Sequence, residues 1–536
     1  MKIKNFSIFF LVLISFPLFS QYQFNETTSI EIFNSYRIYP SEVTQTEVFI
    51  VRSLNDPDLI FSSCNTLTFI PFFVSEGIYV SKDGGNSWQG NDTCTGDPIS
   101  FHGGDPGIAI DKNGRFILTR LGRAPFTGLY SHYSDDNGKS WSSQQVISTD
   151  DLERASVSTD AVESSDHYGR TYASWVKFAQ PYPVMFSYTD DGAESWSDPV
   201  PVNDPPNRSA GGDVTVGPDG EVYVCWAGVT STSPFKEIYA GFATSADGGQ
   251  NWQVLENAFP MNGITGILPE KGNIRVNGLP LIAVDSTNAT RKGWIYIVTG
   301  QKDLPPAGND PDIILNRSTD GGQTWSEGIR VNQDALNNGK IQYFPAVHVD
   351  KFGAVNVLFY DDRNTTSDST GVFLARSTDG GDTWKEYEIS DHNFKPNSIG
   401  GLGQGYQGDN IDLTSNDEKI FPVWMDNSSG IYQIWTAPVD FSVIGGVNDI
   451  SSTETEISVF PNPFSQETSI RFNLSHPSEI QLRIFNINGV EEAKIEMKGK
   501  AGKNHIKWDG NELSSGIYFV QILIGKQNLT GKIIKI

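Results

Sequence analysis

Carboxylates recur where several apolar strands begin in this chain of 536 residues. A Gly-Asp pair stands at such positions in GGDP, GGDV and QGDN, which contain Asp105, Asp213 and Asp409. Glu47 holds the comparable place in QTEV. If these side chains face one channel, their repulsion favours raised pKa values, a bound cation or hydrogen bonds to a polar ligand. The alternative is that each aspartate caps its own turn, because Asx-turns are common where strands begin.

Arginines, tyrosines and further acids stand in segments that we expect to be loops near these strands. RLGRAPF, IQYF and YDDRNTTSD are the main ones, and KFAQPYP adds Tyr182. Aromatic platforms beside carboxylates and arginines suit a sugar or peptide ligand. The ligand-binding residues predicted from these segments are Arg120, Arg123, Tyr343, Asp361, Asp362 and Arg363.

Metal and cofactor signals are weak. The acidic run YDDRNTTSD has two further interpretations, a solvated loop and a Ca²⁺ site. No histidine stands in a zinc-ligand spacing such as HExxH. We therefore expect no cofactor and assign no metal ligand, with Ca²⁺ as the alternative that the acidic residues leave open.

An octapeptide repeat, Ser/Thr-x-Asp-Gly/Asn-x-x-x-Trp, organises the elements around these residues. Its copies begin at Ser81, Ser134, Thr189, Ser245, Ser318 and Ser377. Their tryptophans are 53, 55, 56, 73 and 59 residues apart, which leaves room for about four short strands in each unit. The repeat therefore predicts an all-β fold built from similar sheets.

The octapeptide itself predicts a hairpin turn, with no catalytic role. Its aspartate can accept hydrogen bonds from its own turn, its glycines permit positive φ, and its tryptophan anchors the following strand. The structural residues predicted in this way are Asp83, Trp88, Asp136, Trp141, Asp191, Trp196, Asp247, Trp252, Asp320, Trp325, Asp379 and Trp384.

These copies resemble the Asp-box, or bacterial neuraminidase repeat, of sialidases and other β-propellers. The resemblance covers residues 22–441 and implies a β-propeller. The strand pairs around the boxes form seven units, and the last has no box and no fourth strand of its own. SIEIFN (Ser29 to Asn34) could supply that strand and hide two sheet edges. Seven blades are therefore favoured, and six, the number in the sialidase fold, is the alternative.

A sialidase needs three arginines for the substrate carboxylate, a Tyr/Glu nucleophile pair and an aspartate as general acid/base. YRIYP resembles the family's Phe-Arg-Ile-Pro motif, which implies Arg37 as the first arginine, although Tyr39 interrupts the spacing. Where the family carries its acid/base aspartate, SSCNTLTFIPFFVSEG offers only Glu76 as a carboxylate. The incomplete set of residues therefore does not predict sialidase catalysis. If the chain is an enzyme, the candidate catalytic residues are Arg37, Asp105, Asp213 and Asp409.

The N-terminus predicts export. Lys2 and Lys4 precede the short apolar run IFFLVLI, which is typical of a signal peptide over residues 1–20. This run is shorter than the roughly 20 residues that span a bilayer, and no later segment is long and apolar enough, so we expect no transmembrane anchor. Among the three cysteines, Cys64 and Cys94 could pair after export, and Cys225 in VYVCW is expected to be a buried thiol.

The C-terminal segment predicts a separate domain. A polar linker over residues 442–458 precedes residues 459–536, which hold 8 Lys and 2 Arg against 7 acidic residues. VFPNPF, LRIFNINGVEE and KWDGNELSSGIYFVQI resemble the type A C-terminal sorting domain of the type IX secretion system. The resemblance implies a small β-sandwich, the type IX machinery as partner, and a secreted or cell-surface location. A carbohydrate-binding module is the alternative.

The net charge of the whole chain limits the classes of binding partner that we expect. A formal net charge of -25 argues against a general nucleic-acid binder. The leading prediction is an exported propeller that binds an extracellular glycan or other polar ligand on its axial face. The alternatives are a sialidase-like glycoside hydrolase with rearranged catalytic residues and a non-catalytic surface scaffold or adhesin.

Overall fold

The computed structural model describes residues 30–69, 72–94, 102–287, 289–400 and 405–441, followed by 458–460, 462–474, 477–487, 489–500, 502–511, 513–524 and 527–536. It separates one compact unit, Ile30–Ser442, from a second unit that contains Val443–Ile536. The predicted signal peptide and residues 442–457 of the predicted linker lie outside the described residues.

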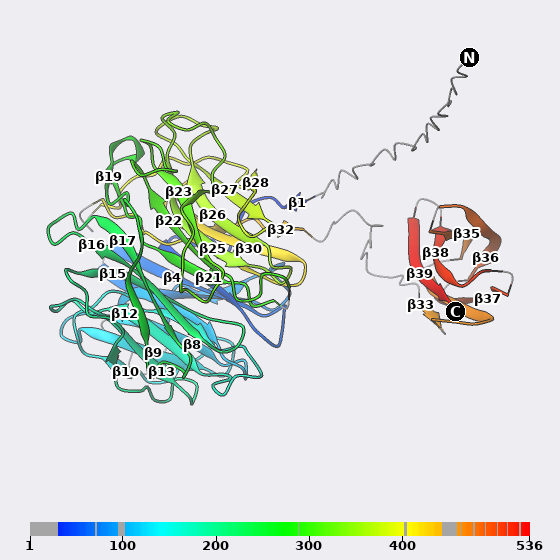
Figure 1. The fold of residues 1–536 in the computed structure, drawn as a ribbon, viewed down its shortest axis with the longest axis horizontal. Helices are drawn as coiled ribbons and strands as arrows, with labels where there is room; N and C mark the ends of the chain where they lie inside the picture. Colours follow the sequence, from blue (N-terminus) through cyan, green and yellow to red (C-terminus); the bar gives the residue numbers. More distant parts are fainter. Residues whose placement is uncertain are drawn as a thin grey trace, which may run out of the picture. The chain divides into compact units, whose positions relative to one another are not determined.

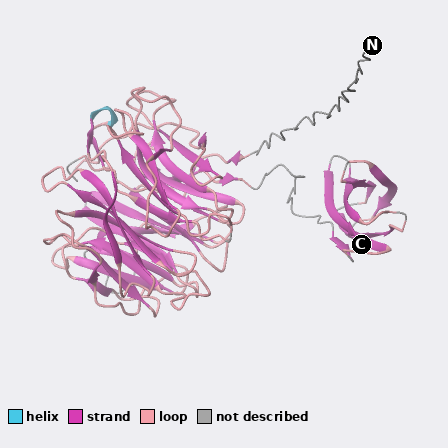
Figure 2. Cartoon of the chain, viewed as in Figure 1, coloured by secondary structure: helices cyan, strands magenta, loops and turns pink. Residues whose placement is uncertain are grey.

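The described part of Ile30–Ser442 contains six antiparallel sheets of four strands, each formed by consecutive strands (Figures 1 and 2). The first two sheets contain β3 (Thr44–Arg52), β4 (Ile60–Phe69), β5 (Phe72–Ser81) and β6 (Gln89–Asn91), and then β7 (His102–Ile110), β8 (Phe116–Gly122), β9 (Gly128–Ser134) and β10 (Gln145–Ser148). The next two contain β11 (Ser156–Thr159), β12 (Thr171–Val176), β13 (Val184–Thr189) and β14 (Val200–Pro201), and then β15 (Ser209–Val216), β16 (Val222–Val229), β17 (Glu237–Ser245) and β18 (Gln253–Pro260). The last two contain β21 (Leu281–Val284), β22 (Ile295–Gln301), β23 (Asp312–Ser318) and β24 (Ile329–Arg330), and then β25 (Gln342–Val349), β26 (Val355–Asp361), β27 (Gly371–Ser377) and β28 (Lys385–Glu388).

A further sheet joins the two ends of this unit. Its strands are β29 (Asp412–Ser415), β30 (Lys419–Asp426), β31 (Gln433–Thr436) and β32 (Val439–Asp440), with β1 (Glu31–Ile32) and β2 (Tyr36–Arg37) from the N-terminal end. β1 pairs with β32, and β2 pairs with β31. The expected closing segment SIEIFN therefore does pair with the last sheet, and Tyr36–Arg37 extends its contribution.

The first strands of these sheets form a closed ring. β3 contacts β7, the contacts continue through β11, β15, β21 and β25, and β29 returns to β3. Sheets arranged in this way around an axis form a β-propeller, so the predicted fold is confirmed. The number of blades stays a prediction, and the order of first strands around this ring supports seven.

The octapeptide turns are closed by their own aspartates. Asp136 accepts hydrogen bonds from Ser140 N at 2.9 Å, Ser140 Oγ at 2.6 Å and Ser134 Oγ at 2.8 Å. The other five copies repeat these contacts with the equivalent residues. The repeated aspartates are therefore occupied in turns, which excludes them from the axial chemistry.

The octapeptide tryptophans connect neighbouring sheets. Trp252 packs edge-on against Phe186 of the preceding sheet at 4.9 Å, and Trp325 packs in the same way against Phe242 at 5.1 Å. Trp141 lies 6.0 Å from Phe61, again in the preceding sheet. Each of these rings buries apolar surface between two sheets, so the repeat stabilises the ring as well as its own turn.

The C-terminal unit has two sheets. One contains β33 (Ser458–Phe460), β34 (Glu467–Leu474) and β37 (Gly502–Asp509). The other contains β36 (Glu491–Gly499), β35 (Ser478–Asn486), β38 (Gly516–Ile524) and β39 (Gln527–Lys535). Ile470 from the first sheet and Leu482 and Val520 from the second are fully buried in one apolar cluster. Two sheets around one core match the predicted small β-sandwich.

Cys64, Cys94 and Cys225 are buried and free, so the structure does not contain the Cys64–Cys94 disulfide considered from the sequence. None of the helices in the described residues combines the length and apolarity needed to cross a bilayer.

Candidate functional site

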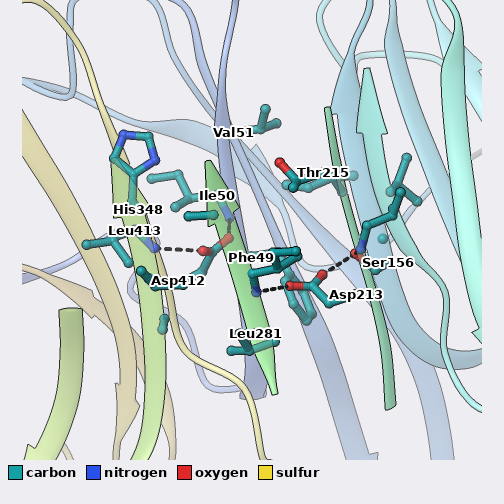
Figure 3. A pocket seen from close by; sticks show the side chains of 18 of the residues that line it. Phe49, Ile50, Val51, Ser156, Asp213, Thr215, Leu281, His348, Asp412 and Leu413 are labelled. Carbon is teal, nitrogen blue, oxygen red and sulfur yellow. Dashed lines mark hydrogen bonds between the residues drawn. The ribbon is translucent and has the colours of Figure 1, made fainter. Parts of the chain in front are cut away.

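The axial channel is lined by residues of all the first strands named above and encloses a cavity of about 350 Å³ (Figure 3). Asp213 and Asp412 are the carboxylates of its wall. Asp213 accepts hydrogen bonds from Ser156 Oγ at 2.5 Å and Ile282 N at 2.9 Å, and thereby joins three neighbouring sheets. Asp412 accepts one from Ile50 N at 3.0 Å. These two aspartates therefore connect the first strands around the axis.

A polar pocket opens where the first strands begin. Its wall contains Glu47, Asp105, Asp213 and Asp409, which are the four carboxylates expected from the sequence to face a common channel. It shares Asp213, Leu281 and residues 154 and 410 with the channel, so the two spaces are continuous. We call this space the axial pocket. The structure therefore brings together carboxylates that are up to 362 positions apart in the chain, from Glu47 to Asp409.

Irregular backbone turns several side chains toward this pocket. The pairing of β3 with β4, of β7 with β8 and of β25 with β26 shifts register beside Glu47, Asp105 and Phe344. These three residues adopt left-handed backbone, with φ of 55°, 55° and 50°. Non-glycine residues rarely hold this conformation, and bulges of this kind commonly redirect a side chain next to a functional site. The recurrence of the bulge explains why carboxylates from separate sheets converge.

Glu47 and Asp105 form an acid pair inside the pocket. Burial raises the pKa of Glu47 well above its ordinary value, and the charges of Asp105 and Asp409 and a hydrogen bond with Asp105 raise it further. Asp105 also accepts a hydrogen bond from Asn65 Nδ2 at 2.9 Å. Glu47 is 5% exposed, so water screens this repulsion poorly. The raised pKa means that Glu47 holds its proton to a higher pH than an exposed glutamate, and a protonated carboxyl group donates a hydrogen bond as well as accepting one.

Two arginines face these acids. Arg275 donates to Asp409 through Nη2 at 3.3 Å and Nε at 3.4 Å, and its guanidinium lies 5.3 Å from the ring of Tyr406. Arg154 donates from Nη2 to Asn410 Oδ1 at 3.0 Å and stacks 4.6 Å from the ring of Phe49. Within the described residues Arg154 has no ion pair, so its remaining donors are available to a ligand.

An inserted hairpin carries Arg275. It consists of β19 (Gly266–Leu268), the 3₁₀ turn η1 (Pro269–Lys271) and β20 (Ile274–Val276), and it accounts for the longest spacing between octapeptides. Lys271 is fully buried and donates to Asp362 Oδ2 at 2.5 Å and to the carbonyls of Ser367 and Ser369, both at 2.7 Å. Arg275 N donates to Gly405 O at 2.9 Å. The hairpin is thus fixed to two other parts of the propeller, and Arg275 is held at the pocket wall.

Several residues predicted from the sequence lie elsewhere. Arg37 belongs to the outer strand β2, 6.0 Å from the Trp435 ring, so the catalytic role implied by the family motif is corrected. Arg120 is buried and donates to His132 and Gln144 within its own sheet. Tyr343 is fully buried and stacks on Tyr360 at 5.1 Å. Arg120 and Tyr343 are buried within the propeller, and none of the three side chains lines the axial pocket.

The acidic loop is also used internally. Asp362 accepts a hydrogen bond from the buried Lys271. Asp361 forms an ion pair with Arg363 at 2.6 Å, and Arg363 forms another with Glu386 at 2.7 Å. The structure therefore corrects their assignment as ligand-binding residues, because each charge already has a partner. Arg123 is half-buried in the loop after β8 and is absent from the wall of the axial pocket. Among the described residues no group of acids, histidines and cysteines could hold a metal ion.

Glu153, Arg154, Arg275 and Asn410 line the pocket but were not predicted. A signal for the first two existed, since they stand just before β11, which begins at Ser156, near the position where three other units carry Gly-Asp. No local sequence pattern marked Arg275, because only the fold of the inserted hairpin places this residue in the wall of the axial pocket. Burial raises the pKa of Glu153, with the charge of Asp105 adding to the effect.

Comparisons with known proteins identify the C-terminal unit. Residues 458–536 match a family described as the secretion system C-terminal sorting domain. This match indicates export through type IX secretion to the cell surface or the extracellular space, as the sequence predicted. No curated protein sequence matches this chain.

Solved structures similar to this chain include a protein of unknown function from Dyadobacter fermentans, with 14% identity, a TM-score of 0.43, and coverage of 77% of this chain and 99% of that one. An ulvan lyase bound to a GlcA and sulfated Rha unit has 12% identity, a TM-score of 0.46, and coverage of 73% and 94%. A Penicillium chrysogenum α-L-arabinanase has 13% identity, a TM-score of 0.41, and coverage of 65% and 98%. All three TM-scores lie below 0.5, so they assign no activity to this chain.

Proposed function

We propose that the exported propeller binds a polar extracellular ligand, a glycan, in the axial pocket. The observation that carries this proposal is the convergence of Glu47, Asp105, Asp409 and the two arginines, Arg154 and Arg275, in one continuous space. A sugar presents closely spaced hydroxyl groups that donate and accept at once. A wall that mixes a hydrogen-bonded acid pair, further carboxyl groups and guanidinium donors is chemically matched to such groups.

A glycan array with the full-length protein, followed by calorimetry on the glycans retained, tests this function. We expect Asp409→Asn and Arg154→Met each to weaken binding by about tenfold or more, because each removes a charged hydrogen-bonding group from the pocket. Asp417→Asn is the matched control, since Asp417 is 68% exposed and contacts Lys351 outside the pocket. Retention of affinity in both pocket variants would reject the axial pocket as the binding site.

A glycoside hydrolase is the second candidate, favoured by the raised pKa of Glu47, which resembles that of a general acid. Retaining and inverting enzymes hold their carboxyl groups about 5–5.5 Å and about 6.5–9.5 Å apart, respectively. The hydrogen-bonded pair of Glu47 and Asp105 is closer than either arrangement. Catalysis would therefore need Asp409, Asp213 or Glu153 as the second carboxylate. Ligand binding needs no such pair and is therefore the leading proposal.

A panel of fluorogenic glycosides separates the two functions. Turnover by the wild-type protein that disappears in Asp105→Asn or Asp213→Asn, with the fold retained, would establish the hydrolase. Turnover that persists at the same rate in Asp105→Asn, Asp213→Asn and Asp409→Asn would exclude these carboxylates from catalysis.

We also propose a domain division consistent with this function. Residues 1–20 direct export and are removed, residues 22–441 form the binding propeller, 442–458 are the linker, and 459–536 engage the secretion machinery. The match of 458–536 to the sorting family and the compactness of Ile30–Ser442 support this division.

A further inference from the structure

Three aromatic rings enclose the guanidinium of Arg208, away from the axial pocket. The guanidinium carbon lies 4.5 Å from the ring centroid of Phe235, 4.8 Å from that of Tyr182 and 5.1 Å from that of Phe178. Phe178 and Tyr182 stand between β12 and β13, and Phe235 stands between β16 and β17. Arg208 itself directly precedes β15. The cluster therefore combines loops of two neighbouring sheets.

The guanidinium has stacking partners but no acceptors. Its Nε is buried without a hydrogen bond, and no described residue forms an ion pair or side-chain hydrogen bond with it. An arginine carries five N–H donors, and buried donors in native proteins nearly always have an acceptor. The rings fix the plane of the cation, so its donors are oriented before any ligand arrives.

The surrounding backbone holds the rings in place. Tyr182 and Phe235 adopt left-handed backbone with φ of 62° and 58°, which bulky residues seldom accept. Ser209 N donates to Tyr182 O at 3.2 Å, and Val229 N donates to Arg208 O at 3.0 Å, so the separate segments are tied together. Strained aromatic residues around an unsatisfied cation are typical of a preorganised binding site.

The cluster lies at the same end of the sheets as the axial pocket. Ser209 pairs with Gly228, so the loop that follows β16 and the segment that precedes β15 are at one end. Gly211, three positions after Arg208, lines the axial pocket. A long extracellular ligand could contact both places, but the contacts of Arg208 do not involve the pocket residues.

We propose that Arg208, with Tyr182, Phe178 and Phe235, binds an oxyanion substituent, carboxylate or sulfate, carried on a sugar ring. Two oxygens of a planar carboxylate or of a tetrahedral sulfate can each accept a hydrogen bond from a guanidinium, and Phe235, which is 37% exposed, adds accessible apolar surface for the sugar ring. This site is distinct from the axial pocket, and its chemistry does not depend on the proposed function.

Binding of D-glucuronate, D-glucose 6-sulfate and neutral D-glucose to the full-length protein tests the proposal by saturation-transfer NMR and calorimetry. We expect at least one acidic sugar to bind tenfold or more tightly than glucose, and the two acidic probes distinguish carboxylate from sulfate. Arg208→Met keeps an apolar side chain among the rings and removes the hydrogen-bond donors. It should therefore reduce the affinity for the acidic sugar to that for glucose. Tyr182→Leu should weaken binding several-fold.

Matched variants locate the site. Arg37→Met changes an arginine that stacks on one ring in the outer strand β2, and it should leave binding unchanged. Equal binding of glucose and both acidic sugars, full affinity in Arg208→Met, or an equal loss in Arg37→Met would each overturn the proposal.

A second measurement on the unaltered protein covers the case in which Arg208→Met does not fold. Phenylglyoxal modifies accessible arginines, and peptide mass spectrometry gives the rate at Arg208. The better acidic sugar should slow this modification at least several-fold, whereas glucose should not. Inorganic sulfate that protects as strongly as glucose 6-sulfate would overturn the role of the sugar ring, and absence of protection by either acidic sugar would overturn the site.

Discussion

Asp412 illustrates how the channel changes a single carboxyl group. Burial raises its pKa from 3.8 to about 7, although Ile50 N and Leu413 N donate hydrogen bonds to it. Burial likewise raises the pKa of Asp213 and of Asp409, where Arg275 opposes the effect. The carboxyl groups along the axis thus have raised pKa values that follow from burial and that the sequence alone does not indicate.

This shift predicts a pH dependence of stability. The folded state holds the Asp412 proton more tightly than the unfolded state, so stability falls as pH rises from 3.8 to about 7 and then levels off. A shift of this size corresponds to at most about 4 kcal/mol. Asp412→Asn cannot titrate, and thermal melts across this pH range should show a shallower slope than the wild-type protein.

Asp417→Asn is the control for this experiment because Asp417 is exposed and lies outside the channel. Its slope should equal that of the wild-type protein. An unchanged slope in Asp412→Asn would mean that Asp412 does not contribute to the pH dependence. Some slope should remain in that variant, since the pKa of Glu47 is raised as well.

At the scale of elements, the octapeptide turn depends on its aspartate. Three hydrogen bonds to Asp136 keep the pKa of its carboxyl at about 2, with that from Ser140 Oγ the largest contribution. Asp136→Ala should therefore lower the unfolding free energy by about 1–3 kcal/mol at neutral pH. Chemical denaturation at several pH values measures this loss.

The sign of the pH effect is opposite to that of Asp412. The Asp136 carboxylate stabilises the fold above pH 3.8, and this contribution is lost as pH falls toward about 2. The difference between wild type and Asp136→Ala should therefore shrink in acid. Lys139→Ala, an exposed change in the same turn, should have little effect at either pH. A difference that stays constant into acid would contradict the role of the carboxylate.

The inserted hairpin makes a second prediction at this scale. Lys271→Met leaves the Asp362 carboxylate buried without its cation, which commonly costs about 3–5 kcal/mol. Amide hydrogen exchange should accelerate over Gly266–Val276 before it does so in the sheets, because Lys271 is the buried attachment of this hairpin.

Lys271→Met/Asp362→Asn is the matched double variant. Asparagine removes the orphaned charge and keeps an acceptor for Ile341 N, which donates to Asp362 Oδ1 at 2.8 Å. Part of the lost stability should return. Faster exchange spread evenly over all sheets in the single variant would show that Lys271 supports the whole propeller and not the hairpin.

At the scale of the whole molecule, the export signal and the proposed binding site belong to different units. The sorting match covers 458–536, whereas the candidate pockets belong to Ile30–Ser442. A chain that ends at Phe441 should keep the thermal transition of the propeller and fail to reach the outside of the cell. Fractionation and surface proteolysis of cells producing the two forms check this expectation, and efficient display of the shortened chain would contradict it.

The sequence determined the features that rest on short-range contacts. The octapeptide turns are closed by residues two to four positions apart, so their fold and their structural aspartates were predictable. The resemblance of these octapeptides to the Asp-box implied a propeller, and the resemblance of the PNP and SSGIY segments to type IX sorting domains implied the sorting domain. The Gly-Asp recurrence even predicted which carboxylates share a pocket, because equivalent positions in repeated units face the same axis.

Only the tertiary structure decided which charges remain available to a ligand. Tyr343 and Asp362 looked like binding residues, but the fold buries Tyr343 and pairs Asp362 with Lys271, which is 91 positions away in the chain. Arg275 reaches the axial pocket, and Arg208 meets its three rings, through contacts between separate units. Burial and pairing depend on which segments converge in space, and local sequence patterns do not contain that information.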